Sequence, residues 1–320
     1  MPCRGAGAQL ARGAVGVCCQ KASETLPFIE AGIADIHISN ELASPRKAMW
    51  LAQAARHARL SVCVDDAAQI AALVAAAQAA DACFGVFVEV DIGQGRCGVR
   101  DADAVLRLLD VLARYPRLAF RGLQAYHGGV QHLRAHAERR SQALRAAERT
   151  GGIVAALAAA GVRCETVTGG GSGSVEFDLQ SGVYTEVQYG SYAFMDRDYA
   201  DNENLGALRF EHALFVATTV MSTASSSHVV VDAGLKSLTT DSGLPSVWQR
   251  RAKGPGLHYE QANDEHGIIT RCGALPALGA MLHLVPGHCD PTFNLHDAVV
   301  GFRGDTIECV WPIAARGLSR

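Results

Sequence analysis

Short apolar runs alternate with alanine-rich helical stretches over the first two thirds of the chain. The runs are rich in Val, Ile, Phe and Cys, and each has the length of one buried strand. Seven strands are predicted: Ala14–Cys19, Asp35–Ser39, Leu60–Asp65, Gly85–Asp91, Leu118–Tyr126, Cys164–Thr168 and Thr185–Phe194. Helical spacing occupies Asp66–Ala79, Asp101–Tyr115, Ala135–Thr150 and Gly152–Ala160. This alternation predicts an α/β fold with parallel strands covered on both faces.

The number of predicted strands leaves two α/β architectures open. A closed barrel of this type takes eight strands, whereas an open doubly wound sheet tolerates seven.

Two helix starts are marked by Asp66 and Asp101, since a carboxylate at an N-cap accepts hydrogen bonds from free backbone N–H groups.

The pattern changes near Leu205 to short strands separated by turn residues. The predicted strands are Ala213–Ser222, His228–Asp232, His258–Asn263, Gly267–Arg271, Met281–Val285, Ala298–Phe302 and Thr306–Val310. Helical periodicity is lost there, which predicts a separate all-β domain. We therefore expect an α/β domain over residues 1–204 and a β domain over 205–320, with a hinge at Asp196–Asn204.

Composition narrows the function classes. A content of 49% apolar and 19% charged residues excludes a disordered chain or a coiled coil. The net charge of −3 argues against a nucleic-acid or polybasic membrane partner, and no apolar run has the length of a membrane span. The N-terminus carries no apolar signal core, so the ten cysteines are expected to be reduced thiols in a cytoplasmic protein.

Two glycine-rich segments follow predicted strands. Gly169–Ser174 lies at the carboxyl end of a strand, where converging backbone N–H groups and serine hydroxyls favour a phosphate site. Gly190 and Ser191 are placed to supply its other half. Gly93–Gly98 fits G-x-G-x-x-G, but the next strand does not end in an acidic residue, which favours a tight loop over a dinucleotide site.

Five further residues carry candidate chemistry. Arg96 is a fixed cation within the Gly93–Gly98 loop. Tyr126 and His132 follow a strand, where they have the chemistry of an acid or base; taken alone, this segment favours a histidine pair on a loop. In the β domain, His288 and Asp290 are two residues apart and suit one divalent metal ion; a polar loop with Asp290 capping a turn is the alternative.

Taken together and in order, these segments resemble the D-threonine aldolase/D-serine dehydratase family of pyridoxal-phosphate enzymes, with the 3-hydroxy-D-aspartate aldolases as the nearest match. The resemblance extends from Ala14 to Leu318. Its segments are Val17–Lys21, Arg96–Val99, Gln124–Tyr126 with Gln131 and His132, Gly169–Ser174, Gln188–Asp196, Val231–Lys236, Asp264–Gly267 and Val285–Asp290.

The resemblance implies an alanine-racemase-like barrel, a following β domain and a homodimer. It implies that Gln20 approaches pyridoxal phosphate. It assigns contacts with this cofactor, mainly around the phosphate, to Ser172, Gly190, Ser191 and Tyr199. It places Arg96 near the pyridine ring or its phenolate oxygen, and Tyr126 beside the cofactor. It implies that His132 is the candidate base and that His288 and Asp290 bind the metal.

The implied reaction is cleavage of a D-β-hydroxy amino acid, D-threonine or D-3-hydroxyaspartate, to glycine and an aldehyde. The cofactor acts as the electron sink and the metal polarises the β-hydroxyl. Dehydratases of this family resemble the chain but carry Cys two residues after the metal His, where Asp290 stands here. This favours an aldolase with magnesium or manganese. Cys289, as a candidate zinc ligand beside His288, leaves a zinc-dependent dehydratase as the alternative.

The resemblance also implies a Schiff-base lysine at the end of a barrel strand upstream of Val17–Lys21. None of Lys21, Lys47, Lys236 and Lys253 matches that lysine. The chain is therefore expected to lack the first barrel strand and the lysine. It is then either an N-terminally truncated form of an aldolase or a catalytically inactive homologue that binds the cofactor without a covalent bond.

Overall fold

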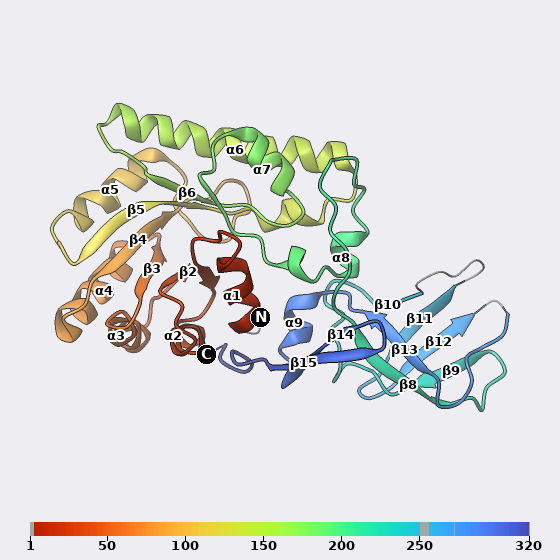
Figure 1. Cartoon of the computed structure of the whole chain (residues 1–320). Coiled ribbons are helices and arrows are strands. Elements are labelled where there is room, and N and C mark those ends of the chain that lie inside the picture. Colours follow the sequence, from red (N-terminus) through yellow and green to blue (C-terminus); the bar gives the residue numbers. More distant parts are fainter. Residues whose placement is uncertain (1–2, 250–255, 272, 320) are drawn as a thin grey trace. The chain divides into compact units, whose positions relative to one another are not determined.

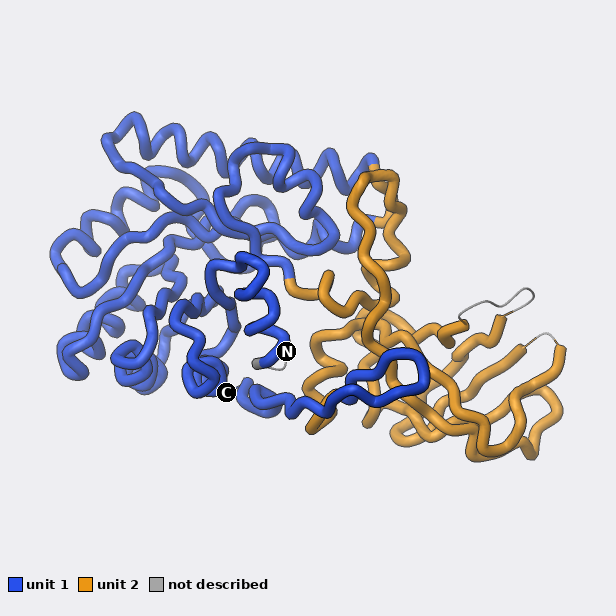
Figure 2. Tube along the Cα trace, viewed as in Figure 1, with its two compact units in different colours: residues 1–133, 137–189, 300–320 blue, residues 134–136, 190–299 orange. Residues whose placement is uncertain are grey.

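The computed structural model describes residues 3–249, 256–271 and 273–319 (Figure 1). They form two compact units (Figure 2). Unit 1 consists of Met1–Leu133, Ala137–Tyr189 and Val300–Arg320; unit 2 consists of Arg134–His136 and Gly190–Val299. The domain boundary at residue 204 stays a prediction.

Unit 1 contains a parallel sheet whose strands follow one another in sequence order. The described residues supply seven strands: β1 (Val17–Cys19), β2 (Asp35–Glu41), β3 (Arg59–Val64), β4 (Phe84–Glu89), β5 (Leu118–Ala125), β6 (Thr166–Gly169) and β7 (Glu186–Val187). Every neighbouring pair is parallel. The predicted α/β class is thus confirmed, as is the order of the seven runs.

β7 is much shorter than its apolar run. The prediction of a strand over Thr185–Phe194 is wrong beyond Val187, because the chain then folds into a 3-10 helix, η3 (Ser191–Ala193). Gln188 donates its backbone N–H to Gly169 of β6 and makes the last contact of that edge.

Helices cover the outer face of this sheet (Figure 1). Unit 1 has α1 (Cys3–Leu10), η1 (Ala22–Glu24), α2 (Thr25–Glu30), α3 (Pro45–Ala54), α4 (Ala67–Ala80), α5 (Ala102–Leu112), η2 (Gly128–His132), α6 (His136–Ala159) and α7 (Val175–Ser181). Asp66 caps α4 by accepting from the N–H of Ala68, and Asp101 caps α5 by accepting from that of Ala104, as predicted.

α6 is one helix, although the sequence predicts two. It continues through Gly151 and Gly152, each of which costs about 1 kcal/mol in a helix interior. Ala147, Ile153 and Leu157 on both sides of the glycines are buried against unit 1. This burial outweighs the weak local propensity.

The two faces of the sheet differ in chemistry. Outward side chains such as Ile36, Val62 and Val86 are fully buried in the core that also holds Leu51 and Leu73 of the helices. Alternate positions on the other face carry buried polar groups: His37, Ser61, Glu89, Gln124 and Thr168. The second face therefore carries many polar groups beside apolar ones such as Cys63 and Phe87.

Unit 2 is built on an antiparallel sheet of the order β10-β13-β8-β9-β12-β11. Its strands are β8 (Val216–Ser222), β9 (His228–Val231), β10 (Ser246–Val247), β11 (Leu257–Ala262), β12 (Gly267–Arg271) and β13 (Met281–Val285). Val220, Val231 and Ile269 lie in its core. The sequence missed β10 and two short helices, α8 (Arg197–Ala200) and α9 (Cys289–Phe293).

A two-stranded ribbon follows, formed by β14 (Ala298–Arg303) and β15 (Thr306–Pro312). The predicted β fold class of the second part is thus confirmed, and its main sheet is antiparallel. Among the helices of the described residues, none combines the length and the apolar composition that crossing a membrane requires.

Candidate active site

The carboxyl ends of the parallel strands gather polar side chains within unit 1. Gln20 follows β1 and donates from Nε2 to Ser39 Oγ of β2 at 2.9 Å. Asn40 Nδ2 donates to the Gln20 carbonyl at 3.0 Å. These bonds fix the predicted cofactor residue Gln20 at the exposed rim of the polar face.

Arg96 and Tyr126 lie close together, because both follow the carboxyl ends of neighbouring parallel strands. The Arg96 guanidinium carbon is 5.4 Å from the centre of the Tyr126 ring, within range of a cation–π contact. Gly98 makes the loop possible, because it has φ +101° and a Cβ there would lie 2.6 Å from the Asp91 nitrogen. The G-x-G-x-x-G segment is thus a tight turn after β4.

Two carboxyl groups beside Arg96 were missed by the sequence analysis. Glu89 of β4 is only 3% exposed, and its Oε1 lies 3.5 Å from Arg96 Nη2. Within the described residues, Glu89 Oε2 and Glu41 Oε1 have no hydrogen-bond partner. Burial, followed by the charge of Glu41, raises the pKa of Glu89 to about 8, and Arg96 opposes the shift. The folded chain therefore favours the protonated form of Glu89.

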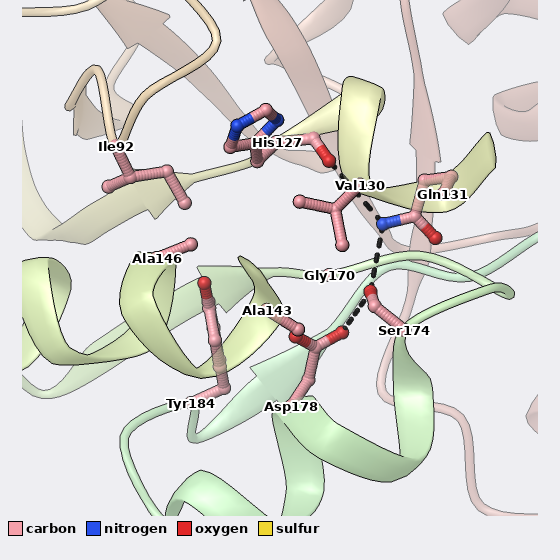
Figure 3. Close-up of a pocket in the computed structure, with 10 residues that line it drawn as sticks. All are labelled: Ile92, His127, Val130, Gln131, Ala143, Ala146, Gly170, Ser174, Asp178 and Tyr184. Carbon is pink, nitrogen blue, oxygen red and sulfur yellow. Dashed lines mark hydrogen bonds between the residues drawn. The ribbon is translucent and has the colours of Figure 1, made fainter. Parts of the chain in front are cut away.

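The Gly169–Ser174 loop packs closely on buried side chains (Figure 3). A Cβ on Gly171 would lie 2.5 Å from Gln131 Oε1, and one on Gly170 would lie 2.5 Å from Asp178 Oδ2. Gln131 Nε2 donates to Ser174 Oγ at 2.8 Å, which in turn donates to Asp178 Oδ2 at 2.6 Å. Close packing therefore explains these glycines without a ligand. The network also braces Ser172, which is half-buried in the loop.

The candidate base His132 ends η2 and is exposed. Its neighbour Gln131 is buried and contributes to the loop support described above. His127, at the start of the same segment, has a buried Nδ1 without a hydrogen-bond partner in the described chain, and burial lowers its pKa.

In unit 2, a fully buried carboxylate joins the predicted cofactor segment to the predicted metal segment. Asp196 Oδ1 accepts the backbone N–H of Tyr199 at 3.0 Å, and Asp196 Oδ2 accepts that of Cys289 at 2.9 Å. The Cys289 thiol lies beside Ser191, and burial raises its pKa. Asp196 thus holds Ser191, Tyr199 and the residue after His288 in one region.

His288 contacts a carboxylate that the sequence analysis did not select. Its Nδ1 lies 2.7 Å from Asp241 Oδ2. Burial raises the pKa of Asp241, but hydrogen bonds from His288 and Thr239 outweigh this effect and hold it below its usual range. Asp290 lies in the first turn of α9 and is exposed.

The lysines occupy separate surroundings. Lys47 lies in α3, and the Lys236 ammonium pairs with Glu265. Lys21 follows Gln20 directly at the start of η1. Lys253 lies outside the described residues.

The donor groups fit the two cofactors that the resemblance implies. In unit 1, the paired Arg96 and Tyr126 offer a cation and an aromatic ring, as pyridoxal phosphate requires. In unit 2, Gly190 and Ser191 stand at the start of η3. For a divalent metal, the His288 imidazole is oriented by a carboxylate at Nδ1, an arrangement typical of metal-ligating histidines.

Comparison with known proteins gives matches along the whole chain. Residues 4–198 match the model for the alanine racemase N-terminal domain, and residues 213–302 match the putative serine dehydratase domain. The chain is 52% identical to a D-threonine aldolase of Arthrobacter over 98% of its length and 82% of that protein. It is 44% identical to a 3-hydroxy-D-aspartate aldolase of Paracoccus denitrificans, over 95% of the chain and 79% of that protein.

The same fold is found in a solved structure. A D-threonine aldolase from Filomicrobium marinum superposes with a TM-score of 0.96 at 47% identity, covering 100% of this chain and 86% of that one.

Proposed function

The chain belongs to the D-threonine aldolase/D-serine dehydratase family of alanine-racemase-like enzymes, and we propose that it is a lyase that cleaves the Cα–Cβ bond of D-β-hydroxy amino acids. The proposed substrates are D-threonine and D-3-hydroxyaspartate, and the products are glycine and an aldehyde. Pyridoxal phosphate supplies an electron sink for the broken bond, and a divalent metal ion supplies a Lewis acid for the β-hydroxyl.

The observation that carries this proposal is the double hydrogen bond of Asp196. A buried carboxyl group is costly unless its oxygens are hydrogen-bonded. Here the two oxygens hold the backbone of Tyr199 and that of Cys289, which follows the metal histidine. A lyase of this type needs its phosphate anchor and its metal ligand at a fixed separation, and the two hydrogen bonds of Asp196 support such an arrangement.

Different residues are proposed to bind different parts of the cofactor. Ser172, Gly190, Ser191 and Tyr199 are assigned to the phosphate, where hydroxyl and backbone donors suit an anion. Arg96 is assigned to the ring side with Tyr126 beside it, supported by their 5.4 Å contact, and Gln20 to the rim of the polar face.

For the reaction itself, His132 takes the proton of the β-hydroxyl, and His288 and Asp290 hold the metal ion. An imidazole and a carboxylate favour magnesium or manganese. Cys289 is only 3% exposed and lies against Ser191 and Asp196. This burial supports a hard ion over zinc, and with it the aldolase over the dehydratase.

The assembly and location are proposed on separate grounds. Val300, Phe302, Ile307 and Val310 on the β14–β15 ribbon are apolar and exposed, which supports a homodimer. All cysteines whose state the structure describes are free thiols, as suits the cytoplasm.

The decisive assay measures products from both substrates, with and without a chelator. It is run on the 320-residue chain and on a form extended by any in-frame codons upstream of Met1. Glycine with an aldehyde supports the aldolase. A 2-oxo acid with ammonia would identify a dehydratase, and cleavage that survives metal removal would contradict the role of His288 and Asp290.

A further inference from the structure

The loop of residues 239–243 in unit 2 packs along the segment that carries His288. Thr239 contacts Thr292 through its backbone N–H and its hydroxyl, both at 3.3 Å, and Thr292 Oγ1 donates to the His288 carbonyl at 2.7 Å. A Cβ on Gly287 would lie 2.1 Å from the Gly243 carbonyl oxygen. The loop is therefore held against this segment at both of its ends.

Between these two attachments, Asp241 Oδ2 lies 2.7 Å from His288 Nδ1, and Ser242 Oγ makes a longer contact of 3.5 Å with the same nitrogen. Both ring contacts in the described chain thus involve Nδ1. An Nδ1–H that donates to a carboxylate fixes the tautomer, so that Nε2 carries the lone pair. The ring is only 27% exposed and is held in one orientation.

A hydrogen bond of this exposure contributes little to folding. Asp241 is 49% exposed, and pairs at such surfaces contribute at most about 1 kcal/mol. The attachments through Thr239, Thr292 and Gly243 hold Asp241 beside His288. The stability of the fold alone does not require this contact. Histidines that bind a metal usually donate their other N–H to a carboxylate, which orients the ring and increases the basicity of the ligating nitrogen.

We propose that Asp241 is a positioning residue of the metal centre, which directs Nε2 of His288 to the ion by accepting the Nδ1 proton. The inference rests on the metal role of His288 in the proposed function. Asp241 does not bind the metal; it acts through the imidazole.

The test measures Mn²⁺ affinity of the full chain by electron paramagnetic resonance of the free ion, in the absence of substrate. Asp241→Ala is expected to weaken binding 10- to 100-fold. Asp241→Asn, whose amide oxygen is a neutral acceptor, is expected to fall between Asp241→Ala and the wild type. Asp264→Asn removes a charge from an exposed turn of the same unit and serves as the matched control with unchanged affinity.

The readouts separate this inference from the proposed function. The unfolding midpoint of the metal-free Asp241→Ala protein should match that of the wild type, which excludes a merely structural role. If His288→Ala abolishes binding while Asp241→Ala binds Mn²⁺ like the wild type, the positioning role is wrong and the metal site stands. A wild-type chain that binds no Mn²⁺ would overturn both.

Discussion

Replacing Glu89 by Gln should make the protein more stable, and increasingly so as the pH rises. In the folded chain the Glu89 carboxyl keeps its proton up to a pKa of about 8, whereas the unfolded chain ionises near 4.5. Between these values the folded state binds more protons, so the free energy of unfolding of the wild type falls with pH. An amide has the shape of the neutral carboxyl and no proton to lose.

The size of the effect follows from this difference in pKa. At about 1.36 kcal/mol per unit, a shift from 4.5 to about 8 corresponds to about 5 kcal/mol. The groups that face Glu89 are Glu41 of β2, Cys63 of β3 and, from the loop after β4, Arg96 and Cys97. The pKa of about 8 already includes the opposing effect of Arg96. Since the unfolded chain is already mostly ionised at pH 5, we expect a stabilisation of about 4 kcal/mol at pH 9 relative to pH 5.

Urea unfolding of wild type and Glu89→Gln at pH 5 and pH 9 measures this directly. Glu138→Gln, at an exposed position in the first turn of α6, is the control and should show no change with pH. The reasoning is refuted if the stability difference between Glu89→Gln and wild type is the same at both pH values.

Three further substitutions or treatments follow from the structure. Gly171→Ala should lower stability by about 1–3 kcal/mol, since the new Cβ displaces Gln131, whereas Gly152→Ala in open space on α6 should gain about 0.5–1 kcal/mol; thermal unfolding that ranks them the other way contradicts the packing argument. Asp196→Asn should weaken retention of pyridoxal phosphate on dialysis and Mn²⁺ binding together, because both depend on one carboxylate; loss of only one would separate the two segments. Borohydride treatment of the 320-residue chain with pyridoxal phosphate, followed by peptide mass mapping, should give no lysine adduct, and an adduct on Lys21 would show that this residue takes the covalent role.

The strand order was predictable because apolar runs and helical spacing are local signals. Asp66 and Asp101 mark their helices within three residues, as a cap must. The length of β7 was not predictable, since an apolar run does not show where its hydrogen-bonded neighbour ends. α6 was split because Gly151 and Gly152 act locally, while the burial that overrides them comes from distant residues.

The groups that support the site could not be predicted from the sequence, because their contacts join residues that are far apart along the chain. Asp241 is 47 residues from His288, and Asp196 is 93 residues from Cys289. Neither contact leaves a spacing signal. Glu89 stands inside an apolar strand run, and the alternation of faces alone does not reveal that it meets Glu41.

The discontinuity of unit 1 has a consequence for synthesis on the ribosome. Its last segment, Val300–Arg320, is made only after all of unit 2, and the Ser23 hydroxyl donates to the carbonyl of Leu318. Domains generally fold as they emerge, N-terminal first. Here Ser23 is made long before its partner Leu318. A stalled or C-terminally clipped chain therefore lacks this contact of the α/β unit, while the inserted β unit is already complete.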